Sequence, residues 1–279
     1  MNARRSFLIP TATAFGFAFL YLPILSMIAF SFNNSRLVTV WDAANSPTLK
    51  WYGILLHNRQ ILDAAWISIR IAAMNATGAC ILGTLAGFAL ARFGRFRGRT
   101  ALSALTTAPL VMPEVITGLS LLLLFVALEQ TVGWPQGRGI TTVTIAHITF
   151  SLSFVTVIVH SRLANFDISL EEAAMDLGAP PATVFRRITL PLITPAILSG
   201  WLLAFTLSWD DVVISQFVAG PGSSTLPMVI FSKVRLGVSP DVNALATIMV
   251  LIVATGVVTS AAWMARQERK RNSANQPTS

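Results

Sequence analysis

The sequence predicts an all-α membrane protein of about six transmembrane helices, with a short helical elbow projecting into the cytoplasm. Only 11% of its 279 residues are charged, whereas about 25% are charged in an average soluble domain. The mean hydropathy is +0.66. Six apolar runs are long enough to cross a bilayer core about 30 Å thick. These observations disfavour a water-soluble protein and favour a single membrane domain.

Six apolar runs are predicted to be transmembrane helices. About 20 helical residues are needed for each crossing, because each residue adds about 1.5 Å along the axis. The runs cover residues 7–32, 61–91, 102–128, 140–160, 192–217 and 244–264. The first is too long for a secretory signal and lacks a small-residue cleavage site, so we expect an uncleaved helix. Pro109 and Pro113 are expected to kink the third helix.

The basic residues predict the orientation of the chain. Those on one side of the predicted membrane are Arg4, Arg5, Arg92, Arg95, Arg97, Arg99, Arg162, Arg186, Arg187, Arg266, Arg269, Lys270 and Arg271. Those on the other side are Arg36, Lys50, Arg59, Arg138, Lys233 and Arg235. Because Lys and Arg are enriched in cytoplasmic loops, the side with more of them is predicted to be cytoplasmic. Both termini lie on that side.

Three segments follow from this arrangement. Residues 1–60 hold the first helix and an outer loop, and residues 61–265 hold five helices and the elbow at 165–191. Residues 266–279 form a polar cytoplasmic tail with too few apolar side chains to fold alone. The outer loop carries three aromatic residues that suit the membrane interface: Trp41, Trp51 and Tyr52.

Several classes of function are disfavoured. The net charge of +8 comes from basic residues that flank apolar runs, a pattern unlike a nucleic-acid surface. Cys80 is the only cysteine, and His57, His147 and His160 lack metal-ligand spacing, so we expect no disulfide and no metal site. No nucleophile, base and orienting acid occur together, so no catalytic residues are predicted. The sequence also lacks the G-x-x-x-x-G-K-[ST] loop that holds nucleotide phosphates.

Small residues repeat every four positions in the second predicted helix. They are Ala79, Gly83, Gly87 and Ala91. This spacing places them on one stripe, where another helix, including one of a partner subunit, can approach closely. Chance enrichment of Gly and Ala in membrane helices is the alternative.

A short helix is predicted within the loop between the fourth and fifth runs. Ser169 and Glu172 have the spacing of a capping box. Apolar residues at helical spacing form one side: Leu170, Ala173, Ala174 and Leu177. Glu171 and Asp176 lie on the other side. Gly178 is expected to end the helix, because a left-handed backbone costs least there.

A second short helix is predicted from about residue 180 to 188. Pro180 and Pro181 suit its first turn, where their missing amide protons are not needed. Together the two short helices form a helix-turn-helix elbow over 165–191 on the cytoplasmic side.

The elbow carries a family signature. Glu172-Ala173-Ala174, three residues, Gly178, nine residues and then Ile188-x-Leu190-Pro191 resemble the cytoplasmic loop of bacterial binding-protein-dependent ABC importer permeases. The resemblance covers about residues 33–264. It is closest to the inner-membrane permease subunits of polyamine (putrescine) ABC transporters. Three further segments carry it: residues 108–118, 208–214 and 220–227.

The resemblance implies a type I ABC importer permease fold, in which the elbow is the coupling helix that seats in a groove of a cytoplasmic ATPase. The residues that it assigns to ATPase coupling are Glu172, Ala173, Ala174, Gly178, Arg186, Ile188, Leu190 and Pro191. Arg186 and Arg187 are expected to pair with acidic groups on the ATPase. Two positions depart from the pattern. Pro180 stands where relatives usually have Ser or Thr, and Trp209 stands where they usually have Leu.

The same resemblance implies the partners. They are two copies of a cytoplasmic ABC ATPase, a second homologous permease, a periplasmic polyamine-binding protein and the bilayer of a bacterial inner membrane. No nucleic acid is involved. ATP and Mg are expected on the ATPase, and this chain holds no cofactor of its own.

Three carboxylates in predicted helices are candidates for the substrate path. Ionisable groups are costly in a bilayer, and Glu114, Asp210 and Asp211 would attract a cationic cargo. Trp209 and Trp201 would add aromatic faces for cation–π contact. Alternatively, the two aspartates lie at the membrane boundary or cap the following turn, since a similar pair occurs in related permeases for other cargo.

The predicted function is import of a polyamine, putrescine by resemblance, with ATP hydrolysis on a separate subunit. Spermidine or another small solute is the alternative within the family. An ion-gradient-driven secondary transporter is the alternative from another class. Such folds often contain inverted repeats, and the sequence has no convincing internal repeat.

Overall fold

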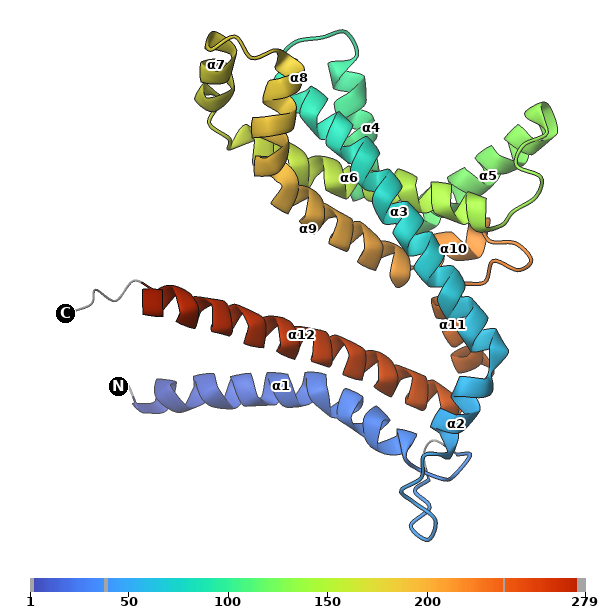
Figure 1. The fold of residues 1–279 in the computed structure, drawn as a ribbon. Helices are drawn as coiled ribbons and strands as arrows, with labels where there is room; N and C mark the ends of the chain where they lie inside the picture. Colours follow the sequence, from blue (N-terminus) through green and yellow to red (C-terminus); the bar gives the residue numbers. More distant parts are fainter. Residues whose placement is uncertain (1–2, 38–39, 238, 275–279) are drawn as a thin grey trace. The chain divides into compact units, whose positions relative to one another are not determined.

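The computed structural model describes residues 3–37, 40–237 and 239–274. These residues form helices joined by loops, with no strand among them (Figure 1). The chain divides into two compact units, one drawn from residues 1–59 and 232–279 and the other from residues 60–231.

The first unit is built on two long helices. Helix α1 (Ala3–Ser31) packs along α12 (Pro240–Ala274), and the short α2 (Lys50–His57) also packs against α12. Trp51 Nε1 donates a hydrogen bond of 2.6 Å to the carbonyl oxygen of Asn33, which fixes α2 to the end of α1. Trp51 is only 7% exposed. The Trp51 ring is therefore used in packing, and its expected place at the membrane interface stays a prediction.

The second unit contains the remaining helices. In chain order they are α3 (Arg59–Arg92), α4 (Arg99–Val111), α5 (Glu114–Val132), α6 (Ile140–Ala164), α7 (Ser169–Asp176), α8 (Pro181–Val184), α9 (Leu190–Trp209), α10 (Val213–Val218) and α11 (Leu226–Leu236), whose last residues join the first unit. A π-helical turn, η1 (Phe185–Thr189), links α8 to α9. Helix α6 packs against α4, α5, α9 and α10, and it forms the centre of this unit.

Two apolar clusters lie along α6, one toward each end. Toward one end, Val155 and Val159 of α6 pack with Ala79 of α3 and Ile193 of α9. Toward the other, α6 packs with α3, α5 and α10 around Phe125. Because the helix is covered along its length, it holds α3, α5, α9 and α10 in fixed positions.

The stripe of small residues on α3 is a packing seam. A Cβ atom on Gly83 would lie 2.7 Å from Val155 Cβ and 2.9 Å from the Leu152 carbonyl oxygen, and one on Gly87 would lie 3.0 Å from the Thr156 carbonyl oxygen. The packing interpretation is thus confirmed. The partner at these positions is α6 of the same chain rather than another subunit.

Five helices among the described residues are long and apolar enough to cross a membrane. They are α1 over Ile9–Ser31, α3, α5, α6 and the continuous stretch Pro181–Trp209. Helix α12 adds a shorter apolar segment, Pro240–Gly256. It continues to Ala274, beyond the predicted end at Met264, and residues 275–279 of the predicted tail lie outside the described residues.

Two predicted helices are wrong as single elements. The third, 102–128, is divided into α4 and α5 at Met112, whose ψ of 135° is extended. Pro113 causes this break, because it lacks an amide proton and forces the residue before it out of the helical region. Pro109 stays inside α4. The fifth, 192–217, is divided into α9 and α10 at residues 210–212.

The seam yields a stability prediction. Gly83→Ala should lower the free energy of unfolding by about 1–3 kcal/mol, because the added methyl meets the backbone of α6. The measurement is thermal unfolding of the purified protein in detergent. Gly53→Ala in α2 is the matched control, since no atom lies within 4 Å of its Cβ position. Equal midpoints for the two variants would contradict the seam.

Candidate functional site

The elbow begins at α7, and Asp167 caps its first turn. Asp167 Oδ1 accepts the N–H of Ser169 at 3.0 Å. That hydrogen bond holds the pKa of the Asp167 carboxyl below its usual value, because it favours the charged form. The predicted capping box of Ser169 and Glu172 is wrong. The carbonyl of Ile168 already accepts the first helical bonds, so Ser169 lies inside the helix.

Gly178 ends α7 as predicted. Its φ is +85°, and its N–H donates to the carbonyl of Met175 at 2.9 Å. The N–H of Ala179 donates to the carbonyl of Ala174 at 3.1 Å. This pair of bonds is a Schellman motif. No atom lies within 4 Å of a Cβ placed on Gly178, so the backbone conformation, rather than lack of space, requires glycine.

The second half of the elbow is not a separate short helix. Pro181 occupies the first turn of α8 as predicted, but α8 continues through η1 into α9 without a break. Pro191 has no amide proton to donate four residues back, and the π turn ends two residues before it, at Thr189. The predicted end of a helix at residue 188 is therefore wrong.

The residues assigned to ATPase coupling lie along the elbow. Those that are exposed are Glu172, Ala173, Gly178, Arg186 and Pro191, and those that are half-buried are Ala174, Ile188 and Leu190. The apolar side of α7 is open, with Leu170 49% and Leu177 90% exposed. Among the described residues nothing covers that side, so it is available to another molecule.

Glu171 is buried, and the sequence reasoning missed its role. Its Oε2 lies 3.1 Å from Arg92 Nε, and Arg92 Nη2 donates to Oε1 at 3.3 Å. Thr189 Oγ1 also donates to Oε1 at 2.7 Å. Arg92 Nη1 donates to the carbonyl of Leu163 at 3.2 Å. The guanidinium lies 5.5 Å from the ring centroid of Phe166. We call these five residues the elbow joint.

The elbow joint connects the ends of several elements. Arg92 ends α3, Leu163 lies in the last turn of α6, and Thr189 ends η1. Arg92 and Glu171 are 79 positions apart, so no local pattern could reveal the pair. The one hint in the sequence was that two glutamates follow each other, although only the second, Glu172, belongs to the family signature.

A second polar cluster surrounds His147 in α6, whose side chain is 2% exposed. Hydrogen bonds join its Nδ1 to Ser208 Oγ at 2.7 Å and its Nε2 to Asp211 Oδ2 and Ser215 Oγ, each at 3.1 Å. Because an ionised carboxylate only accepts, Nε2 carries the proton toward Asp211. This cluster ties α6 to the break between α9 and α10.

Asp211 caps the turn that follows it. Its Oδ1 accepts the N–H of Ile214 at 3.2 Å, and its Oδ2 accepts the N–H of Ser215 at 2.8 Å. Together with His147, these bonds occupy a carboxylate whose side chain is 7% exposed. Of the two interpretations open for Asp211, the cap is the one that the geometry supports.

Glu114 and Asp210 are exposed. Glu114 begins α5 and lies within electrostatic range of Asp210 and Asp211. Neither Glu114 nor Asp210 forms an ion pair within the described part of the chain. Two exposed carboxylates thus lie at the start of α5 and at the end of α9.

Three aromatic rings on α9 lead toward Asp210. Trp201 and Phe205 stack with centroids 5.4 Å apart, and Phe205 and Trp209 stack at 6.2 Å. All three are half-buried, so each keeps part of its surface open. The arrangement provides π faces beside carboxylates, a combination suited to organic cations.

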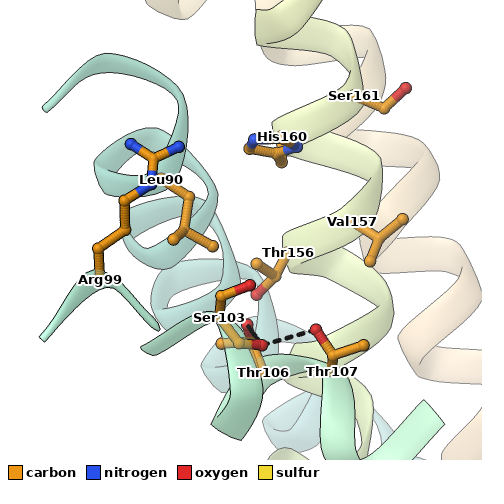
Figure 2. Close-up of a pocket in the computed structure, with 9 residues that line it drawn as sticks. All are labelled: Leu90, Arg99, Ser103, Thr106, Thr107, Thr156, Val157, His160 and Ser161. Carbon is orange, nitrogen blue, oxygen red and sulfur yellow. Dashed lines mark hydrogen bonds between the residues drawn. The ribbon is translucent and has the colours of Figure 1, made fainter. Parts of the chain in front are cut away.

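A pocket of about 290 Å³ lies among α3, α4 and α6. Figure 2 shows Arg99 on the α4 side and His160 on the α6 side, with the hydroxyls of Ser103, Thr106 and Thr107 gathered below them. None of the nine described lining residues is a carboxylate. The charged group among them is the guanidinium of Arg99.

Comparison with known proteins places these features in a family. Residues 83–273 match the family "Binding-protein-dependent transport system inner membrane component". The chain is 56% identical over 258 residues to the putrescine transport system permease protein PotI of Escherichia coli (strain K12), covering 92% of this chain and 90% of that protein. It is 43% identical over 256 residues to the spermidine/putrescine transport system permease protein PotC of the same strain, covering 92% and 93%.

Solved structures share the fold. A chain of a bacterial ABC transporter involved in the import of the acidic polysaccharide alginate aligns with a TM-score of 0.70 at 18% identity, over 95% of this chain and 98% of that one. A chain of the inward-facing MetNI methionine ABC transporter aligns with a TM-score of 0.59 at 15% identity, over 79% and 98%. At these identities the likeness concerns the fold alone.

The two adjacent aspartates should differ in their effect on stability. Asp211→Ala should lower the free energy of unfolding by about 0.5–2 kcal/mol, because it removes the cap of α10. It also leaves His147 without its acceptor. Asp210→Ala, one residue away and exposed, is the control and should change stability little. Thermal unfolding in detergent distinguishes them, and equal losses would contradict the capping role of Asp211.

Proposed function

This chain belongs to the family of binding-protein-dependent transport system inner membrane components, and we propose that it is the permease subunit through which an ATP-driven importer carries putrescine into the cytoplasm. It is a non-catalytic membrane component. The observation that carries the choice of cargo is the 56% identity to a putrescine permease over nearly the whole chain. Identity to a spermidine/putrescine permease is lower, at 43%, which makes spermidine the second candidate.

The carboxylate face supports a cationic cargo. Putrescine is a diamine with a positive charge at each end and no negatively charged group. Glu114 and Asp210 supply two exposed negative charges close to each other. Trp209 lies beside Asp210 at the end of the aromatic stack. A dication passing this face meets counter-charge and π surface together.

The elbow supports energy coupling to a separate ATPase. The apolar side of α7 is open, and Arg186 and Arg187 are exposed nearby on η1. An apolar face flanked by basic residues suits a groove with acidic edges. We assign that groove to a cytoplasmic ATPase, of which the transporter has two copies that hold ATP and Mg. A second homologous permease and a periplasmic polyamine-binding protein complete the assembly, and both termini of this chain lie in the cytoplasm.

The mechanism follows from the continuity of the elbow with the bundle. ATP binding draws the two ATPases together and displaces the docked elbows. Because α8 runs through η1 into α9, the displacement reaches a helix that carries the aromatic stack. The bundle then changes its opening from the cytoplasmic to the periplasmic side. This is alternating access driven through rigid elements.

The cargo assignment predicts the effect of removing charge. Glu114→Gln and Asp210→Asn should each lower putrescine uptake at subsaturating concentration about 1.4- to 5-fold, because an exposed charge pair contributes about 0.2–1 kcal/mol. The measurement is uptake of radiolabelled putrescine by the reconstituted complex. Asp63→Asn, an exposed carboxylate elsewhere in α3, is the control. Unchanged uptake in both test variants would remove these carboxylates from the path.

The coupling assignment predicts a strict requirement for glycine at position 178. Gly178→Val should abolish uptake and transport-linked ATP hydrolysis while the protein still inserts, because a β-branched residue at φ +85° is strained by roughly 1–2 kcal/mol or more. Gly178→Asn is the matched control and should keep most activity, since Asn tolerates the left-handed region. Wild-type transport by the valine variant would refute the coupling role.

A further inference from the structure

The attachment of α7 to the rest of its unit is unusual. Helix α7 has eight residues, and helices shorter than about 12–15 residues are marginal in water without tertiary contacts. Its one buried residue is Glu171, which is 8% exposed over the whole residue. Leu170, Met175 and Leu177 are exposed, and Ala174 is the one apolar residue of α7 that is half-buried. A polar contact, rather than apolar packing, therefore fixes this helix in place.

The contact reaches several elements at one point. The carboxylate of Glu171 accepts hydrogen bonds from Arg92, at the end of α3, and from Thr189, at the end of η1. Arg92 in turn donates to the carbonyl of Leu163 in α6. Helices α6 and α9 pack along each other. Any displacement of α7 is thus delivered at once to the cytoplasmic ends of α3, α6 and α9.

The chemistry of the joint makes it stiff. The guanidinium donates a hydrogen bond from Nη2 to Glu171 Oε1, and its Nε lies 3.1 Å from Oε2 as an ion-pair contact without hydrogen-bond geometry. A hydrogen bond between two charged groups is stronger than one between neutral groups. Both side chains are largely shielded, with 13% of Arg92 and 11% of Glu171 exposed. Removing one partner of a shielded pair leaves the other charge uncompensated. The pair therefore resists separation when force is applied to α7.

We propose that Arg92, Glu171 and Thr189 are positioning residues for energy coupling, forming the joint through which the elbow moves as one body with α3, α6 and α9. This role rests on the proposed function, because it presupposes an ATPase docked on α7. The two adjacent glutamates have different roles. Glu172 is exposed and faces the docked partner, whereas Glu171 faces inward and holds the elbow to the bundle.

The test measures coupling separately from folding. The complete complex, with its ATPase, second permease and putrescine-loaded binding protein, is reconstituted with Glu171→Gln or Thr189→Val in this chain. Putrescine uptake and ATP hydrolysis are measured together. The ATPase should remain bound, while uptake per ATP falls on the order of 5-fold or more with Glu171→Gln, the lower end of typical coupling between two sites. Thr189→Val keeps the ion pair and should give a smaller loss.

Charge reversal and a matched arginine complete the test. Arg92→Glu alone should uncouple the complex, and the double variant Arg92→Glu with Glu171→Arg should restore part of the uptake per ATP. Arg95→Gln, an exposed arginine three positions further on, is the control and should keep the wild-type ratio. Should Glu171→Gln fail to assemble, Thr189→Val and the double variant decide the matter.

Two outcomes would contradict the proposed role of the elbow joint. One is a wild-type ratio of uptake to ATP in assembled Glu171→Gln and Thr189→Val complexes. The other is a double variant that recovers expression and assembly but no coupling, which would make the pair a structural contact only. Failure of the proposed function has a different signature, because the wild-type complex itself would then show no ATP-dependent putrescine uptake.

Discussion

The carboxylate of Glu171 is the constraint on which the position of the elbow depends. Helix α7 turns its apolar side outward and buries this one acidic group, so its place is set by what a shielded carboxylate requires. A charge removed from water needs a counter-charge and hydrogen-bond donors. Arg92 and Thr189 supply them. Because these residues end α3 and η1, the need to satisfy one charge brings the ends of several helices together.

The same requirement shapes the opposite half of the unit. Asp211 is shielded and is satisfied by His147 and by two amides of α10. The apolar run 192–217 predicted one continuous helix. The structure instead begins a new helix, α10, after Asp211, whose side chain caps its first turn. Two pairs of adjacent acids thus behave alike. Glu171 and Asp211 are shielded and hydrogen-bonded within the fold, whereas Glu172 and Asp210 are exposed.

The sequence was informative where the signal is local. Apolar runs predicted the spans, Gly178 predicted the left-handed stop, and Pro181 predicted a helix start, because each depends on composition or on one residue's backbone. Partners distant in the chain left no local signal. Arg92 and Glu171 are 79 positions apart, and His147 and Asp211 are 64 apart. The inward turn of Glu171 contradicts the simple expectation that a charged side of a short helix faces solvent. The family resemblance predicted a coupling role for the elbow, but of its two adjacent glutamates the signature includes only Glu172.

Uptake of labelled putrescine by proteoliposomes tests the central claim most directly. The vesicles hold this chain with its ATPase and second permease, and the binding protein is loaded and supplied outside. ATP-driven import through this chain predicts accumulation that requires hydrolysable ATP and disappears when the ATPase is omitted. Accumulation by this chain alone, driven by an imposed ion gradient without ATP, would contradict it.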